Sequence, residues 1–419
     1  MPLHNAETTS GVLRLAQSAA RLANRVRPRS PLLVDALIED ARSSTRLEDF
    51  GDADFLAPLA QLVSSLENEA RLTPFGREIA RTRLRVHLVN RLRLQADRSN
   101  DPAIREQQII RPLFIVGPPR TGTSILFRLL ARDERALAPM AWQLQTPSPP
   151  PPRRIRRTSP LYLRAWADEL FLRFSLPRLR AIRDTRADLP EECCVLQAAA
   201  FVSILFAIAF DVPSYQGLLL EADYSSSYVW HKAALQQLQL GAGGHGAWVL
   251  KSPGHLFSLD TLFAHYPDAC IVQTHRDPLE FVPSLASLSA VLRSLSCEPG
   301  DPATLAESTA SFWATALERA LHSRSVRSDL ENRFVDIRHD EIAADPIAVV
   351  ERIYAHFDRE LSPRSRNAMT RYLAANPRDR HGRHEYSPEA FGLDRRVEAR
   401  RFARYRTALH FGADPDLGR

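Results

Sequence analysis

Residues 117 to 124, GPPRTGTS, have the spacing of a phosphate-binding P-loop, G-x-x-x-x-G-K-[ST]. Gly117, Gly122 and Ser124 fit this pattern, but Thr123 stands where the pattern has a lysine. A short apolar run before the loop and a segment of helical periodicity after it supply the strand, loop and helix that the motif requires. The sequence therefore predicts a phosphate-binding loop that works without the usual lysine.

Two other polar clusters follow predicted strands. The segment LKSPGHL brings Lys251 and His255 after one strand, and THRDPLEFVPS brings Arg276 after another, with Ser284 in the helix beyond it. In an open parallel sheet, ligands bind beyond the carboxyl ends of the strands. Polar clusters after three strands therefore indicate one shared site.

The ordered trio GPPRTGTS, LKSPGHL and HRDPLEFVPS resembles the sulfotransferase family that uses 3′-phosphoadenosine 5′-phosphosulfate (PAPS), in its bacterial branch. The resemblance runs from about residue 30 to 395 and includes FGDADF at 50–55 and HGRHEYSPEAFGL at 381–393. It implies transfer of a sulfuryl group from PAPS to the hydroxyl of a small-molecule or lipid-like alcohol, with no metal. A kinase needs Lys and Mg²⁺ for its more highly charged phosphoryl group, whereas sulfuryl transfer does not.

The resemblance also implies which residues bind the donor. Backbone and hydroxyl groups of the loop would hold the 5′-phosphate, and Arg120 would supply the cation that cytosolic relatives take from a lysine. Arg276 and Ser284 would grip the 3′-phosphate, since a guanidinium can bond phosphate through two N–H groups at once. The predicted donor ligands are Arg120, Thr121, Gly122, Thr123, Ser124, Arg276, Ser284, Arg380 and Arg383, the last two forming a second 3′-phosphate clamp within RHGR.

The general base is expected among three residues. His255 is the first choice, because K-S-P-G-H approximates the K-T-H of cytosolic relatives, with Lys251 placed to stabilise the oxygen that bridges sulfur and phosphate. Other branches use a glutamate, so Glu191 and Glu192 in LPEECC remain candidates, although both can also serve the start of a helix. Gln143 stands where many relatives have an acid.

Alternating strands and helices predict the elements that position these residues: an α/β, three-layer sandwich with a central parallel sheet. A helical N-terminal layer is expected at 1–108, and an α/β domain at 109–419 with a helical acceptor-side insertion at about 150–245. The predicted strands are 113–116, 248–250, 269–273 and 333–337.

Three helical patterns carry further expectations. Val12, Leu15, Ala19, Leu22 and Val26 recur on one helical face. The apolar run at 195–210 predicts one buried helix, and 224–230 with Trp230 and His231 is expected to face the acceptor. The proline-rich stretch 147–160 predicts an extended connector.

Composition narrows the classes of protein. The net charge of +6 is modest and no nucleic-acid-binding motif accompanies it, so no nucleic acid is expected as partner. The run at 195–210 is too short for a membrane span, and the N-terminus shows no signal peptide. Four cysteines without metal or disulfide spacing indicate free thiols. We therefore expect a cytoplasmic protein. The sequence leaves open whether it forms a homo-oligomer.

Two other functions compete with sulfuryl transfer. A P-loop kinase would use an acid near Asp336 or Asp340, but it also needs the lysine that Thr123 replaces. A non-catalytic member of the same fold would bind the nucleotide without turnover. Measured turnover distinguishes this binding module from an enzyme.

Overall fold

The computed structural model describes residues 10–26, 30–182, 184, 186–377 and 389–411. Its sheet has five parallel strands in the order β2-β3-β1-β4-β5. They are β1 (Leu113–Val116), β2 (Ala136–Leu137), β3 (Ala247–Lys251), β4 (Cys270–His275) and β5 (Phe334–Arg338). The predicted α/β fold is confirmed, and the four predicted strands are joined by β2, a two-residue edge strand that the sequence pattern did not indicate.

The central strand β1 sets the position of the P-loop. Its residues are completely buried, and it pairs with β3 on one side and β4 on the other. Ile115 lies beside Lys251, and Val116 lies beside Gln273. The segments that leave β1, β3 and β4 therefore begin side by side, as three polar clusters at one site require.

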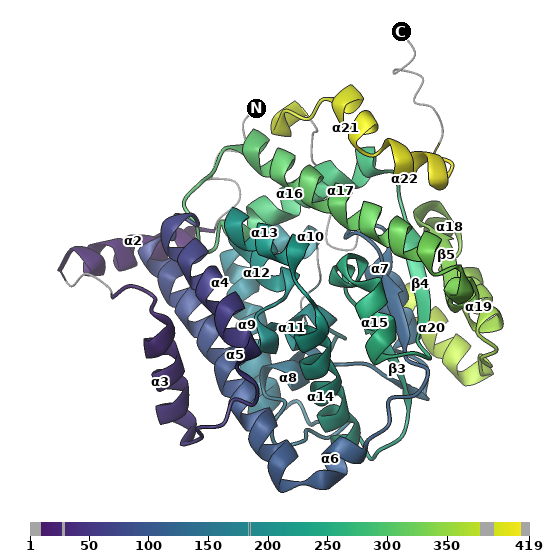
Figure 1. Cartoon of the computed structure of the whole chain (residues 1–419), viewed down its shortest axis with the longest axis horizontal. Coiled ribbons are helices and arrows are strands. Elements are labelled where there is room, and N and C mark those ends of the chain that lie inside the picture. The colour runs from purple at the N-terminus through teal and green to yellow at the C-terminus, as the bar shows by residue number, and fades with distance from the viewer. Residues whose placement is uncertain (1–9, 27–29, 183, 185, 378–388, 412–419) are drawn as a thin grey trace.

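Helices cover both faces of the sheet (Figure 1). Leu113 and Ile115 share a core with α7 (Thr123–Leu130), α19 (Pro346–His356) and α20 (Pro363–Ala375). Phe114 and Val116 belong to the opposite core, with α14 (Ser225–Gly241), α15 (Leu259–His265), α16 (Pro278–Arg293) and α17 (Pro302–Val326). Because side chains alternate along a strand, this division establishes three layers.

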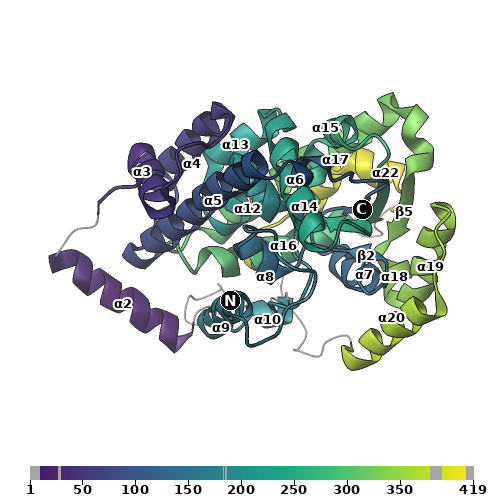
Figure 2. The ribbon, with the colours of Figure 1, turned by 90° about the horizontal axis from the view of Figure 1, so that it is seen from below.

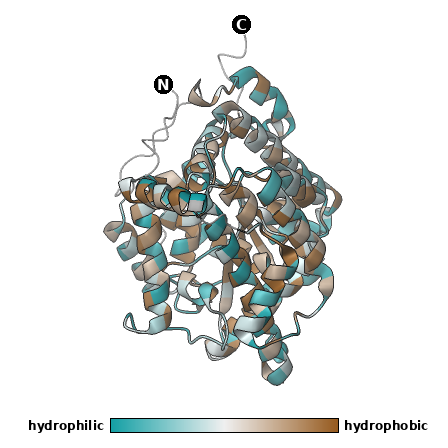
Figure 3. Cartoon of the chain, turned by 90° about the vertical axis from the view of Figure 1, so that its left-hand side faces the viewer, coloured by the Kyte–Doolittle hydropathy of each residue, from teal (hydrophilic) through white to brown (hydrophobic). Residues whose placement is uncertain are grey.

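Five described helices precede the sheet: α2 (Gly11–Val26), α3 (Val34–Thr45), α4 (Leu56–Asn68), α5 (Pro74–Asn100) and α6 (Pro102–Glu106). Helices on this side of the molecule carry both hydrophobic and hydrophilic residues (Figure 3). None of the described helices combines the length and apolar composition that crossing a membrane requires. The division of the chain near residue 108 stays a prediction.

The apolar face predicted for α2 does not face the core. Val12, Leu15 and Leu22 are 60%, 73% and 64% exposed, while Leu13 and Ala20 are buried. The helix docks through this other face, from which two polar side chains reach the segment after α16: Gln17 donates to the carbonyl of Ser294, and Arg21 pairs with Glu298. Figure 2 shows α2 at the edge of the molecule beside α9 (Pro160–Ser175).

The predicted single helix at 195–210 is broken in the structure. It consists of α11 (Cys193–Gln197), a 3₁₀ turn η2 (Ala198–Ala200) and α12 (Ile204–Ala209). Phe201 adopts a left-handed conformation with φ of 56°, and the Ser203 hydroxyl then accepts from the Leu205 N–H to cap α12. The apolar composition predicted the burial correctly, but it carries no signal for this turn.

The remaining described elements connect or flank those above. Between β2 and β3 lie α8 (Ala141–Gln145), α10 (Leu179–Ile182) and α13 (Pro213–Glu221). Others are η1 (Ala53–Phe55), η3 (Pro253–Phe257), η4 (Ser328–Arg333), α18 (His339–Ala344), η5 (Glu389–Phe391), α21 (Arg395–Arg401) and α22 (Ala403–Ala408). No helix or strand lies between Gln145 and Pro160, as the proline-rich sequence predicts.

Arg91 of α5 ties the N-terminal helices to the insertion. Its completely buried guanidinium donates to the carbonyls of Phe50, Asp52 and Ala199 and pairs with Asp54 at 2.8 Å. It also lies 4.1 Å from the centroid of the Trp230 ring on α14. One charged side chain thus joins three parts of the chain.

We expect Arg91→Met to lower the free energy of unfolding by about 3 to 5 kcal/mol, because it leaves buried acceptors unpaired. Arg85→Met on the same helix is the matched control. The Arg85 side chain is 40% exposed and pairs with the exposed Asp40, so its loss should cost at most about 1 kcal/mol. Urea unfolding measures both, and equal losses would contradict this role of Arg91.

Candidate active site

The P-loop contains three residues with positive φ: Gly117 at 146°, Arg120 at 74° and Gly122 at 92°. A Cβ on Gly117 would lie 2.2 Å from the Thr274 hydroxyl oxygen, and one on Gly122 would lie 2.7 Å from Ile342. Only glycine fits at these two positions. Arg120 is strained in this conformation, and such strain is concentrated at functional sites.

The hydroxyl of Thr121 fixes the loop to the sheet. It donates to the Pro118 carbonyl at 2.7 Å and lies 2.6 Å from the hydroxyl oxygen of Thr274 on β4. Thr121 is completely buried. Its side chain therefore shapes the loop, and only its backbone can serve a ligand.

Thr123 and Ser124 open α7, directly after Gly122. Thr123 is buried and Ser124 is exposed. The first turn of a helix directs backbone N–H groups and a partial positive charge toward an anion. This start of α7 can bind phosphate without a lysine side chain.

Arg120, Arg276 and Ser284 come together from the loop, the end of β4 and α16. The Arg120 Nε donates to the Ser284 hydroxyl at 3.2 Å, and its Nη1 donates to the carbonyl of Ile182 in α10 at 2.8 Å. Arg276 Nη1 donates to the Arg120 carbonyl at 3.0 Å, and its Nε pairs with Glu280 at 2.9 Å. Two arginines and a hydroxyl thus lie beside one loop.

Lys251 and Glu192 form an ion pair at the end of β3. The ammonium nitrogen is 2.5 Å from the Glu192 Oε1, and the two side chains are 5% and 14% exposed. Glu192 directly precedes α11, so it belongs to the insertion rather than to the sheet. The Glu192 carboxylate therefore accepts from the nearly buried ammonium of Lys251. Lys251 is paired with Ile115 of β1, the strand that leads into the P-loop.

His255 lies in the interior. It has no exposed surface, its Nδ1 is 2.7 Å from the Tyr228 hydroxyl, and Phe114 of β1 packs against its ring at 5.0 Å. Burial lowers the pKa of His255 to about 3, so the imidazole is neutral at physiological pH. Sequence spacing placed it after β3 correctly, but it could not show that η3 turns the side chain inward.

Other sequence candidates also have local partners. The Glu191 carboxylate accepts from the N–H of Glu192, and the Gln143 amide oxygen accepts from the N–H of Met140 at the start of α8. Trp230 packs on Arg91, and the completely buried His231 contacts Tyr266. These last two belong to the core instead of the expected acceptor surface. Arg380 and Arg383 lie outside the described residues.

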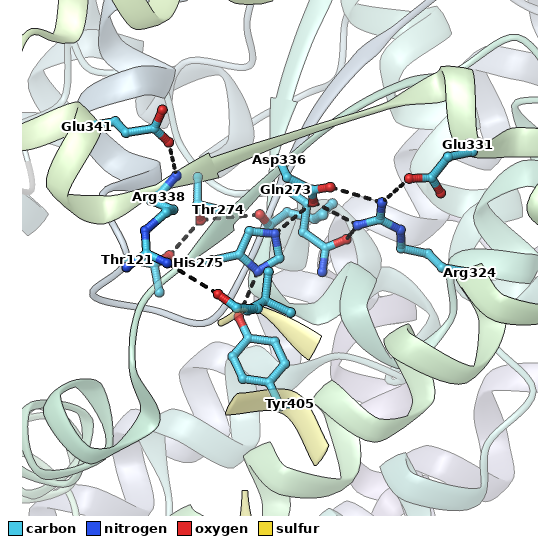
Figure 4. Close-up of polar contacts among 12 residues, drawn as sticks. Thr121, Gln273, Thr274, His275, Arg324, Glu331, Asp336, Arg338, Glu341 and Tyr405 are labelled. Carbon is cyan, nitrogen blue, oxygen red and sulfur yellow. Dashed lines mark hydrogen bonds and ion pairs between the residues drawn. The ribbon is translucent and has the colours of Figure 1, made fainter. Parts of the chain in front are cut away.

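A polar network behind the loop was missed by the sequence analysis (Figure 4). The two His275 ring nitrogens lie 2.7 Å from Asp336 Oδ1 and 2.8 Å from the Tyr405 hydroxyl. Arg324 donates to both oxygens of Asp336 at 2.7 and 3.0 Å. Burial acts to raise the pKa of Asp336, but the hydrogen bonds from His275 and Arg324 outweigh it and hold that pKa well below its usual range. The sequence THRD at 274–277 was the signal that could have revealed this network, because His275 is the last residue of β4.

Comparison with known proteins gives the following relatives. Residues 112–363 match the family model described as Sulfotransferase family. The omega-hydroxy-beta-dihydromenaquinone-9 sulfotransferases Stf3 of Mycobacterium bovis and Mycobacterium tuberculosis are 24% identical over 254 residues, 58% of this chain. The match spans 62% of the length of these curated relatives.

Two solved structures resemble most of the chain. Sulfotransferase STF1 from M. tuberculosis H37Rv is 32% identical, with a TM-score of 0.78, over 89% of this chain and 99% of that one. Sulfotransferase STF9 from Mycobacterium avium is 27% identical, with a TM-score of 0.80, over 90% and 96%. Both comparisons include the N-terminal helices as well as the sheet, since they cover more of the chain than residues 112–419.

The Asp336 network predicts a pH-dependent stability. Because the folded-state pKa lies below the usual value of 3.8, the carboxylate stabilises the fold above that pH and loses this effect as pH falls further. Its side chain is 41% exposed, so solvent screening limits the effect. We expect Asp336→Asn to lose about 1 kcal/mol at pH 7.

The difference between wild type and Asp336→Asn should shrink as pH falls below about 4. Urea unfolding at pH 7 and pH 3 measures it. Asp340→Asn, whose side chain is 70% exposed, is the matched control and should differ little at either pH. A difference that stays constant or grows toward acid pH would show that the pKa of Asp336 is not lowered.

Proposed function

Because this chain belongs to the sulfotransferase family, we propose that it transfers a sulfuryl group from PAPS to the hydroxyl of a lipid-like or other small alcohol. The observation that carries the proposal is the cluster of Arg120, Arg276 and Ser284 beside a P-loop without its lysine. These residues meet at the carboxyl ends of parallel strands, where an open sheet binds its ligands.

The donor would lie across this cluster. Backbone N–H groups of Thr121 to Ser124, together with the Thr123 and Ser124 hydroxyls, hold the 5′-phosphate at the start of α7. Arg120 supplies the cation, and Arg276 and Ser284 hold the 3′-phosphate, with Arg380 and Arg383 as a second clamp. This ligand set needs no metal at the phosphates. The contacts among Arg120, Arg276 and Ser284 support it, because they keep two cations beside the loop.

We propose Glu192 as general base in place of His255. Glu192 takes the proton of the acceptor hydroxyl while the acceptor oxygen bonds to sulfur, and the bond from sulfur to the phosphate oxygen breaks. Lys251 lies near the charge that develops on that phosphate oxygen. Glu192 is partly exposed and already bonded to Lys251, whereas His255 is buried with its Nδ1 against Tyr228. Glu191 is the alternative.

The acceptor is proposed at the level of chemical class. The curated relatives are named for a hydroxylated menaquinone derivative, which supports a lipid-like alcohol here. The P-loop kinase alternative lacks its lysine, and the non-catalytic alternative is distinguished by turnover. A cytoplasmic location is supported by the four cysteines, which form no disulfide among the described residues.

The donor assignment predicts selective nucleotide binding. Adenosine 3′,5′-bisphosphate should bind at least tenfold more tightly than adenosine 5′-phosphate, as expected for charged hydrogen bonds to the 3′-phosphate. Arg276→Ala should remove most of this preference without weakening the monophosphate comparably. Arg366→Ala, an exposed arginine paired with Glu351, is the control. Calorimetry measures all three, and equal affinities in the wild type would refute the assignment.

The choice of base is tested by single-turnover transfer from PAPS to an accepted alcohol. We expect Glu192→Gln to lower the rate at least about a hundredfold while bisphosphate affinity stays within about threefold. The acid limb of the pH profile should disappear with the carboxylate. Glu191→Gln is the matched control and should lose far less. Normal turnover by Glu192→Gln would return the role to His255 or Glu191.

A further inference from the structure

Three buried side chains form a group of potential metal ligands behind the Lys251 and Glu192 pair. Cys193 begins α11, His231 lies within α14, and His255 lies in η3. Their ligand atoms all lie within 4.8 Å of one another, and none of the three side chains is exposed. Residues this far apart in sequence show no metal-binding spacing, so the group becomes visible only in the fold.

The tyrosines beside both histidines leave one nitrogen of each ring for a ligand. His231 Nδ1 is 2.8 Å from the Tyr266 hydroxyl, and His255 Nδ1 is 2.7 Å from the Tyr228 hydroxyl. Both Nε2 atoms are buried without a hydrogen-bond partner among the described residues. With Nδ1–H donating to tyrosine oxygen, each Nε2 carries a lone pair. A hydrogen bond from the other ring nitrogen is the usual support of a metal-bound histidine.

Two unpartnered imidazole nitrogens in the core are costly unless a ligand satisfies them. A thiolate with two imidazoles is a donor set that Zn²⁺ prefers, and three such ligands leave a fourth tetrahedral position. We propose that Cys193 Sγ, His231 Nε2 and His255 Nε2 bind a structural zinc ion. Binding replaces the thiol proton by the metal, which releases one proton.

This zinc site would hold both members of the Lys251 and Glu192 pair in place. Glu192 directly precedes Cys193, and Lys251 is at the end of the strand that leads into η3 with His255. The ion joins α11 to the segment after β3. The proposal does not depend on the identity of the sulfuryl acceptor or donor.

Metal content tests the site directly on the full chain. Protein expressed in zinc-supplemented medium should hold about one zinc per chain by elemental analysis, the stoichiometry of a single structural site. Expression with Co²⁺ should give the near-ultraviolet charge-transfer band of a thiolate ligand and the visible bands of tetrahedral cobalt. Cys193→Ser should lose the thiolate band, and His231→Gln should lower the metal content. Cys297→Ser, which replaces another buried free cysteine, should change neither.

Thermal unfolding supplies a second readout, on the wild type itself. Wild type from zinc-supplemented medium should melt at a higher temperature than wild type from zinc-depleted medium, and Cys297→Ser should keep this difference. Wild type with no more zinc than Cys193→Ser, and with the same melting temperature from both media, would overturn the proposal. A buried water between the three side chains would then be the occupant.

Discussion

The close approach of the P-loop to β4 is the constraint on which the rest of the site depends. Gly117 leaves β1 so near Thr274 that no side chain fits between them, and the Thr121 hydroxyl closes the loop against the same residue. Parallel pairing alone brings strand ends together, but it does not fix the direction of the loop. This contact does, and it sets where α7 starts and where Arg120 lies relative to Arg276.

Charged groups around the loop are held by bonds to other groups of the protein. Arg120 and Arg276 donate to backbone carbonyls, and Lys251 pairs with Glu192. The Asp336 carboxylate bonds to both His275 and Arg324. Fixed groups of this kind need little reorganisation when charge develops, which is the basis of electrostatic catalysis. The network at Asp336 also fixes the end of β4, because His275 is the last residue of that strand.

The sequence predicted the parallel sheet and the positions of three polar clusters, because apolar runs that end in glycine or charged residues have a local signature. Strand β2 was not predicted, because a strand of two residues is too short to show an alternating or apolar pattern. The apolar face of α2 was expected to be buried because Leu15 and Leu22 are as apolar as core residues. The helix instead docks through the face of Leu13 and Ala20, which the periodic pattern does not mark. The burial of His255 and the pairing of Glu192 with Lys251 depend on tertiary packing of the insertion, which spacing cannot encode.

The bond from Arg120 to the carbonyl of Ile182 has a consequence for how such an enzyme can diverge. The segment that contains α10 also carries Glu192, so one part of the chain orients Arg120 in the P-loop and also pairs with Lys251 at the end of β3. Substitutions that move this segment would therefore alter both contacts at the same time. Its divergence is then confined to changes that leave the backbone at Ile182 where it is.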